Sequence, residues 1–299
     1  MFGTAMRPGN TSESRDWRPL AAALVAICLW SSAYVGIRAA TRTIAPGALA
    51  LGRLAIGSVL LGALLARRGA VRPTRRELGL LCLAGFLWFG LYNVALNTAE
   101  RVVDAGTAAM VVNIAPLLIM ALAALFLHER LTPNLLAGGA VAFAGVILIG
   151  LATTSGNAPL WGVLLCVIAT AASAGGVVAQ KPVLGRLSAL QVTWTCCVIG
   201  AMVCLPYAPR LVHDLRAAAP GDLAWMAYLG VFPTSVAFTS WAYALARGTA
   251  SRLAALAYLV PPITIGMSWF ILGEVPKLVA VLGGALCLAG VIFARRGPK

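Results

Sequence analysis

Thirteen polar or aromatic side chains that could hold a small molecule lie inside long apolar stretches of the sequence. They are Trp30, Ser31, Tyr34, Trp88, Tyr92, Asn93, Asn113, Thr193, Trp194, Thr234, Phe238, Trp241 and Tyr258. If these side chains faced lipid, their hydrogen-bonding groups would stay unsatisfied. We therefore predict that, as a set, they line a polar and aromatic cavity. For any single Trp or Tyr, an interfacial anchor or a helix contact is the alternative.

Asn113 and Tyr258 form the most informative pair in this set. Each precedes a proline, Pro116 or Pro261, by three residues in the middle of an apolar stretch. Proline lacks a backbone N–H and clashes with the preceding turn, so both stretches should be interrupted there and leave carbonyl groups free. We expect Asn113 and Tyr258 to line one cavity from opposite sides. A kink without any ligand is the commoner outcome of such a proline.

Arg53 is the one charged residue well inside an apolar stretch. It lies about 10 Å from the start of that stretch at a helical rise of 1.5 Å per residue. A buried arginine without a carboxylate partner is unfavourable, so its guanidinium should reach backbone carbonyls, water or an anionic group of a ligand. A structural role is favoured over ligand contact, and both stay open.

The same stretches contain few residues that could perform catalysis. The two histidines, His128 and His213, lie at loops or helix ends, and the seven cysteines fit small buried apolar side chains better than ligands or disulfides. Neither a metal-ligand spacing nor a glycine-rich GKS or GKT loop for a nucleotide occurs in the sequence. We expect a protein that is not an enzyme and that uses no cofactor and no metal.

The composition explains why the candidate residues lie where they do. Of 299 residues, 61% are hydrophobic and 11% charged, with a mean hydropathy of +0.90, whereas a soluble domain has about 25% charged residues. Stretches long enough to span a bilayer as a helix cover roughly residues 19–37, 46–66, 77–98, 105–127, 132–151, 159–180, 188–206, 222–245, 251–272 and 277–294. The sequence therefore predicts an all-α membrane protein with ten transmembrane helices.

The positive charges predict the orientation of these helices. The net charge of +14 lies mainly at the ends of the apolar stretches, and with a cytoplasmic N-terminus 16 Lys and Arg fall on the inner side against 6 on the outer side. By the positive-inside rule, both termini are cytoplasmic. We accordingly expect the lipid bilayer, and not a nucleic acid, as the partner of this basic chain.

Two segments of the chain repeat one another. At a constant offset of 145, the stretch 128–147 (HERLTPNLLAGGAVAFAGVI) matches 273–292 (GEVPKLVAVLGGALCLAGVI), including Glu129 with Glu274. We predict two five-helix repeats, 19–151 and 159–294, between cytoplasmic tails 1–18 and 295–299. Because five is odd, the second repeat must be inverted, which is a recurrent build of secondary transporters with alternating access.

The repeated residues have local interpretations as well. The paired glycines should allow close helix contact: Gly138, Gly139, Gly145, Gly283, Gly284 and Gly290. Glu129 and Glu274 lie at tight turns, where a carboxylate can accept backbone N–H groups at the next helix start. We favour this capping role over proton coupling.

Energy coupling follows from where the acidic residues lie. All nine are in tails, loops or helix ends, whereas proton relays usually need an acid or a histidine inside the membrane. We therefore expect transport that is not obligatorily coupled to protons. Glu129 and Glu274 are the two acids that could still couple transport to protons, because they could titrate from a water-filled cavity.

The repeated glutamate turn and glycine helix resemble the signature of the EamA-type exporters of the drug/metabolite transporter superfamily. The stretches ICLWSSAYVGIR (27–38) and PGALALGRLAIGSVLLGALLARR (46–68) are similar to that family's first two helices, with Arg53 at its arginine position. The resemblance implies a 5+5 inverted fold in the bacterial plasma membrane, acting as a monomer. It further implies export of amino acids or other small metabolites through a cavity lined by the first four helices of each repeat. The stretch TAASAGGVVAQKPV departs from the aromatic-rich pattern of the sixth helix.

Other functions stay open at this point. Purines, drugs or other metabolites are alternative substrates, and a proton antiporter or an importer would share the same architecture. A non-transporting membrane scaffold is the remaining alternative. A substrate cannot be identified from these residues alone.

Overall fold

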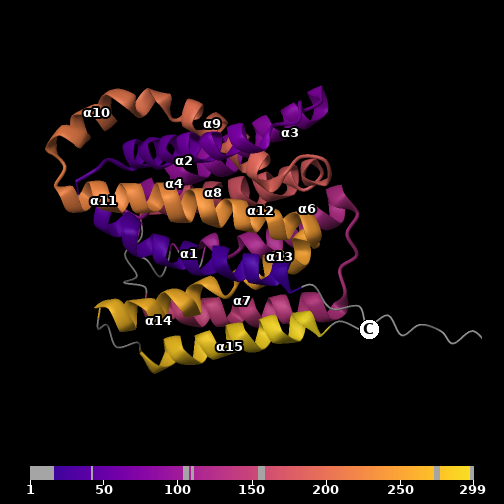
Figure 1. Cartoon of the computed structure of the whole chain (residues 1–299). Helices are drawn as coiled ribbons and strands as arrows, with labels where there is room; N and C mark the ends of the chain where they lie inside the picture. The colour runs from indigo at the N-terminus through magenta and orange to yellow at the C-terminus, as the bar shows by residue number, and fades with distance from the viewer. Residues whose placement is uncertain are drawn as a thin grey trace, which may run out of the picture.

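The computed structural model describes residues 17–41, 43–103, 108, 111–153, 159–272 and 277–296, and all regular secondary structure in them is helical. Figure 1 shows most of the helices lying side by side along one common direction, as expected for a bundle of spans. Glu274 and Asp104 lie outside the described residues.

The helices of the first half are α1 (Arg18–Ala40), α2 (Pro46–Arg68), α3 (Arg75–Ala84), α4 (Tyr92–Ala99), α6 (Ala115–Leu127) and α7 (Pro133–Thr153). Those of the second half are α8 (Leu160–Gln180), α9 (Ala189–Val203), α10 (Ala208–Ala217), α11 (Pro220–Leu229), α12 (Phe238–Arg247), α13 (Ala250–Ala257), α14 (Val260–Leu272) and α15 (Leu278–Arg295). Short 3₁₀ turns, η2 (Val183–Gly185) and η3 (Leu205–Tyr207), lie beside α9.

The molecule is a multi-pass membrane protein. Within the described residues, seven helices are long and apolar enough to span a bilayer, or eight when α9 and the segment Leu205–Ala217, bent by 54°, are counted as one broken span. Arg18–Tyr34 and Ala115–Leu127 are shorter apolar helices. Each of the ten expected stretches coincides with one of these helices, but length and composition alone support seven or eight spans rather than ten.

Two wide helical turns were not expected. A π-helical segment, η1 (Gly85–Leu91), joins α3 to α4, and a second, η4 (Gly230–Ala237), joins α11 to α12. The second begins 145 residues after the first, which is the offset of the sequence repeat. Such π segments are rare and concentrate at functional sites.

The predicted proline interruptions are present. The chain leaves the helix at Asn113–Ile114 and again at Tyr258–Leu259, and α6 and α14 begin directly afterwards. Pro116 and Pro261 therefore lie in the first turn of a new helix, where the missing N–H needs no partner.

The repeated glycines lie at close helix contacts, which confirms their predicted role: Gly138, Gly145, Gly283 and Gly290 pack α7 against α15, whereas Gly139 faces α6 and Gly284 faces α14. A Cβ on Gly138 would lie 2.5 Å from the Gly290 carbonyl oxygen, and a Cβ on Gly145 would lie 2.5 Å from the Gly283 carbonyl oxygen. Only residues without a side chain allow two backbones to approach this closely. Figure 1 shows the resulting pair of helices, α7 and α15, side by side.

Glu129 caps a helix, but not the next one along the chain. Its carboxylate accepts hydrogen bonds from the Ala250 amide (2.8 Å), the Ser251 amide (3.0 Å) and the Ser251 hydroxyl (2.6 Å) at the start of α13. The expected partner was the start of the helix that follows Glu129. The carboxylate instead joins the two halves of the chain, because α13 and α7 pack together at this end.

Candidate functional site

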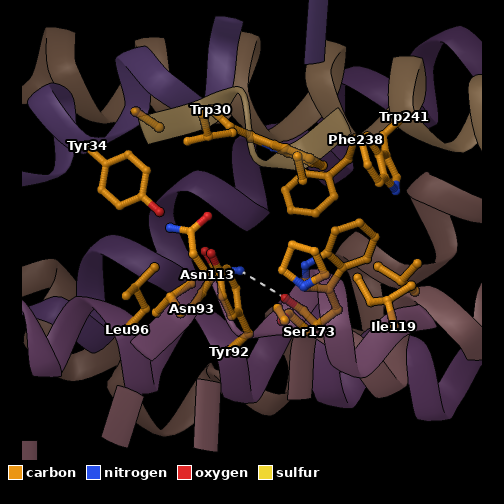
Figure 2. Close-up of a pocket in the computed structure, with 18 of the residues that line it drawn as sticks. Trp30, Tyr34, Tyr92, Asn93, Leu96, Asn113, Ile119, Ser173, Phe238 and Trp241 are labelled. Atoms are coloured by element: carbon orange, nitrogen blue, oxygen red, sulfur yellow. Dashed lines mark hydrogen bonds between the residues drawn. The ribbon is translucent and has the colours of Figure 1, made fainter. Parts of the chain in front are cut away.

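A cavity of about 130 Å³ lies between the two halves of the chain. This is about ten times the roughly 10–15 Å³ that one water molecule needs, and below the roughly 300–1,000 Å³ typical of sites for drug-sized ligands. Eight of the thirteen predicted residues line it: Trp30, Tyr34, Trp88, Tyr92, Asn93, Asn113, Phe238 and Trp241. Figure 2 shows how these side chains surround the space.

One end of the cavity is polar. Figure 2 shows the Tyr34 hydroxyl and the Asn113 amide pointing toward one another, with Tyr92 and Asn93 beside them. The Asn93 amide nitrogen donates to the Phe89 carbonyl oxygen at 2.8 Å, which fixes the side chain against its own helix. This end therefore presents hydroxyl and amide groups to a ligand.

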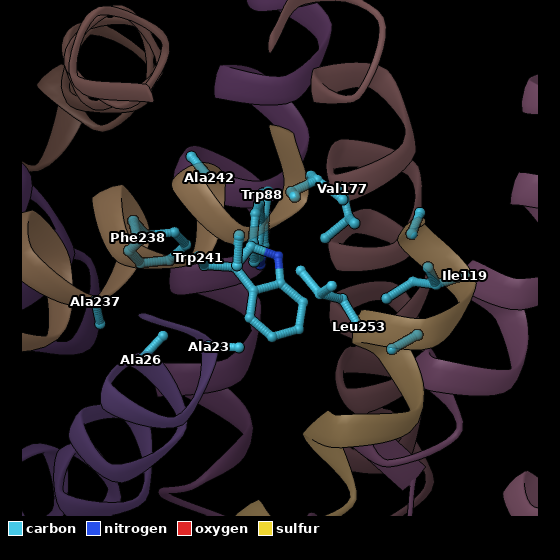
Figure 3. Packing of buried hydrophobic residues seen from close by; sticks show 14 of the residues in the cluster. Ala23, Ala26, Trp88, Ile119, Val177, Ala237, Phe238, Trp241, Ala242 and Leu253 are labelled. Atoms are coloured by element: carbon cyan, nitrogen blue, oxygen red, sulfur yellow. The ribbon is translucent and has the colours of Figure 1, made fainter. Parts of the chain in front are cut away.

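The other end is a cluster of aromatic rings packed edge-to-face or tilted against one another. The Trp30 ring centroid lies 5.1 Å from that of Trp241 and 5.4 Å from that of Phe238, and Trp88 lies 4.8 Å from Phe238. Figure 3 shows Trp88, Phe238 and Trp241 among the apolar side chains that surround them. The indole nitrogens of Trp30 and Trp241 are buried without a hydrogen-bond partner among the described residues. Rings at these distances form an apolar wall.

Arg53 contributes the one guanidinium group among the lining residues that the structure describes. Its side chain comes from α2 and is 4% exposed. The Nε group donates to the Thr234 hydroxyl at 2.9 Å, which places Thr234 behind Arg53 rather than in the lining.

Ser31, Thr193 and Trp194 do not line the cavity. The Ser31 hydroxyl lies 2.9 Å from the Ile27 carbonyl oxygen and 3.2 Å from the Val260 carbonyl oxygen, and so joins α1 to α14. Thr193 is buried inside the bundle. The Trp194 indole N–H donates to the Ser58 carbonyl oxygen at 3.1 Å, where Trp194 packs on α2.

Asn113 and Tyr258, which we expected to line one cavity, lie in different environments. Asn113 lines the cavity, whereas Tyr258 is fully buried outside it, with its ring 6.4 Å from that of Phe143 on α7. The Tyr258 hydroxyl has no hydrogen-bond partner among the described residues. Both residues fall where a helix breaks, so their directions could not be extrapolated from helical spacing.

Ten further lining residues are small or aliphatic and do not belong to the predicted thirteen: Ala33, Ile37, Leu96, Val112, Ala115, Ile119, Ser173, Val177, Ala257 and Val260. Ser173 carries the one hydroxyl group among these ten. Several of these lining residues could have been predicted from the sequence repeat. Asn93 and Phe238 are repeat mates at the offset of 145, and so are Leu96 and Trp241. The same holds for Val112 with Ala257 and for Ala115 with Val260. Matching positions of the two halves thus surround the cavity.

The lining agrees only in part with the expected first four helices of each repeat. Residues from α1, α2, α4 and α6 contribute in the first half, and residues from α8, α12, α13 and α14 surround the cavity in the second. The helix α9 contributes none of the lining residues of the described chain, because η1 and α12 pack between it and the cavity.

Apolar helices surround a small cavity with hydroxyl, amide, indole and guanidinium groups, an arrangement that suits a small molecule between the spans of a membrane protein. The chain belongs to the EamA-like transporter family, whose model matches residues 17–151 and again residues 160–296. This double match agrees with the repeat and confirms the resemblance to EamA-type exporters.

Individual relatives point in the same direction. The chain is 36% identical to a protein of Streptantibioticus cattleyicolor named "Probable terminal-alkyne amino-acid exporter", over 92% of each chain. It is 29% identical to the "Uncharacterized transporter YdfC" of Bacillus subtilis, over 89% of this chain and 87% of that protein. It is 25% identical to a "Probable amino-acid metabolite efflux pump" of Salmonella typhimurium, over 90% of this chain and 92% of that protein.

A solved crystal structure supports the fold. It matches with a TM-score of 0.77 and covers 96% of this chain and 100% of that chain. Because the two sequences are 22% identical, the likeness bears on the fold alone.

Proposed function

We propose that this protein is a secondary transporter that exports small metabolites, with amino acids foremost, across a bacterial plasma membrane. The observation that carries the proposal is the cavity at the meeting of the two halves, with a polar end and an aromatic end. An amino acid has a charged end and a side chain, and these fit the two ends. The names of two relatives as amino-acid exporters support the same substrate class.

We propose a 5+5 inverted arrangement with both termini in the cytoplasm and a monomer as the working unit. In this scheme the bent segment of α9 and α10 supplies one span, and Arg18–Tyr34 and Ala115–Leu127 lie within two more. The interruptions at Asn113 and Tyr258, which are repeat mates, fit the broken helices that bind substrates near the membrane midplane in such folds.

Alternating access requires that one side of the cavity be closed while the other is open. Two contacts on the side assigned to the cytoplasm fit a closed inner side. Glu129 caps α13, and the Lys181 ammonium donates to the carbonyl oxygens of Leu245 (2.6 Å) and Gly248 at the end of α12. Export then requires these contacts to break so that substrate can enter from the cytoplasm.

Counterflow from proteoliposomes tests the proposal. Vesicles loaded with unlabelled substrate take up a labelled trace of any compound that the protein carries. We expect counterflow for apolar amino acids and none for organic cations, because the lining contains a guanidinium and no carboxylate among its described residues. Counterflow of cationic dyes or purines in place of amino acids would contradict the substrate class, and none for any solute would favour a scaffold.

A further inference from the structure

The Arg53 guanidinium has hydrogen-bonding capacity that the described protein leaves unused. The side chain is 4% exposed, and within the described residues its one hydrogen bond runs from Nε to the Thr234 hydroxyl. No ion pair joins it to an acid of that part of the chain. A guanidinium has five N–H donors, so its two terminal nitrogens have four to offer.

Those terminal nitrogens belong to a residue that lines the cavity. Arg53 lines the same cavity as Tyr34, Tyr92 and Asn113, and it lies within electrostatic reach of Tyr92. The Glu100 carboxylate acts on the Arg53 guanidinium electrostatically, but the described residues form no direct ion pair between the two. A buried charge without a direct partner is strongly unfavourable, so such residues usually meet an opposite charge or mark a pathway. The Thr234 hydroxyl holds Nε at 2.9 Å and thereby fixes the direction of the planar group.

We propose that Arg53 is the carboxylate-binding residue of the cavity, and that the site selects substrates bearing a carboxylate beside a compact apolar group. This inference rests on the proposed function and deepens it. The two terminal nitrogens of the guanidinium match the two oxygens of a carboxylate in a bidentate pair, which is short and directional. The rings of Trp30, Trp88, Phe238 and Trp241 then receive the apolar group at the other end.

The size of the cavity limits that apolar group. A volume of about 130 Å³ suits a branched aliphatic chain and leaves little room for several fused rings. Amines that lack a carboxylate would place a positive charge beside the Arg53 guanidinium and be repelled, since two like charges in a medium of low dielectric destabilise one another.

Ligand-induced thermal stabilisation of the purified full-length protein in detergent tests the carboxylate preference without any transport step, because a ligand of the folded state raises the unfolding midpoint. The four probes share one branched chain and differ in their ends: L-leucine, 4-methylpentanoate, L-leucinamide and 3-methylbutylamine. We expect the first two to raise the midpoint and the last two, at equal concentration, to leave it unchanged.

Substitutions then assign the preference to Arg53. Arg53→Gln should weaken binding of L-leucine by about ten- to one-hundredfold, as expected for the loss of charge-assisted hydrogen bonds. Arg53→Lys keeps the charge but loses the planar fork, so it should retain weaker binding and the same preference for acids. Arg68→Gln, at the exposed end of the same helix, is the matched control and should bind as the wild type does.

Several results would overturn the proposal: equal stabilisation by the amine or amide, stabilisation by none of the four probes, or an unchanged preference in Arg53→Gln. If Arg53→Gln does not fold, the proposal is carried by Arg53→Lys, and unweakened binding there would contradict the bidentate pair. The experiments also distinguish a failure of the proposed function from a failure of the carboxylate subsite. Carboxylate binding without amino-acid counterflow refutes export of amino acids and leaves the subsite intact, whereas counterflow with an unchanged preference in Arg53→Gln refutes the subsite alone.

Discussion

The thiol of Cys287 lies 3.3 Å from the carbonyl oxygen of Ala142, its counterpart 145 residues earlier in the repeat. On either side of this contact, Gly138 meets Gly290 and Gly145 meets Gly283. A shift of 145 residues exchanges these two glycine contacts and leaves the Ala142–Cys287 contact in place. The contacts between α7 and α15 are therefore those of a two-fold pair, with Ala142 and Cys287 next to the axis.

The glycine contacts predict a stability defect. Gly145→Ala would place a Cβ 2.5 Å from the Gly283 carbonyl oxygen, and neither backbone can move without separating α7 from α15. We expect a loss of about 1–3 kcal/mol in the free energy of unfolding, as for other overpacked sites. Thermal unfolding in detergent measures it. Gly79→Ala is the control, because a Cβ there meets nothing within 4 Å, and an equal effect of both substitutions would contradict the close approach.

Loss of the Glu129 carboxylate should loosen the start of α13. Glu129→Gln keeps one carbonyl oxygen as an acceptor but removes the charge that two backbone amides and the Ser251 hydroxyl share. We expect a loss of roughly 1–3 kcal/mol and faster hydrogen exchange at the amides of Ala250 and Ser251. Asp222→Asn, at a partly exposed acid in the first turn of α11, should leave that exchange unchanged. Unaltered protection in Glu129→Gln would refute the capping role.

Asn113 and Tyr258 should respond differently to substitution even though they are repeat mates. Asn113→Ala removes an amide from the cavity and should lower transport efficiency by about two- to tenfold, the effect of one hydrogen bond. Tyr258→Phe removes a buried hydroxyl that has no partner among the described residues, so transport should persist and the unfolding midpoint should hold or rise. A transport defect in Tyr258→Phe with normal folding would place Tyr258 on the substrate pathway.

A pH gradient should not drive accumulation of the substrate. The lining residues of the described cavity include no Asp, Glu or His, and Arg53 stays protonated at any working pH. Proteoliposomes with equal substrate on both sides and an imposed pH gradient should therefore stay at equilibrium. Accumulation that a protonophore abolishes would refute uncoupled transport, and Glu129→Gln would then test whether its carboxylate carries the proton.

The helices and the contacts of the repeated glycines could be predicted because both follow from local spacing. A run of about 20 apolar residues in lipid must satisfy its own backbone, and only a helix does so within one segment. Gly138 and Gly145 stand seven residues apart, two helical turns, so they share a face wherever the helix packs. These inferences needed no knowledge of the partner helix.

Side-chain directions next to irregular backbone could not be predicted in the same way. Tyr258 follows the last regular turn of α13, so helical spacing no longer gives its direction. Thr234 lies inside the π-helical segment η4, which changes the number of residues per turn, and it does not line the cavity as Phe238 and Trp241 do. The polar groups of Thr234 and Trp194 led us to predict that both residues line the cavity, and this was wrong. Their hydrogen bonds join them to the Arg53 Nε group and to the Ser58 carbonyl oxygen. Partners of this kind come from distant parts of the chain.

The π segments η1 and η4 occupy matching positions in the two halves of the chain. A π turn arises when one residue is inserted into an α-helix, and here η1 and η4 begin at Gly85 and Gly230, the same place in each half. One insertion that preceded the duplication of the repeated segment would account for both. Removing a residue from either segment would rotate everything beyond it by about 100° and carry Asn93 or Phe238 off the cavity wall. Both π segments are therefore needed to keep Asn93 and Phe238 at the cavity.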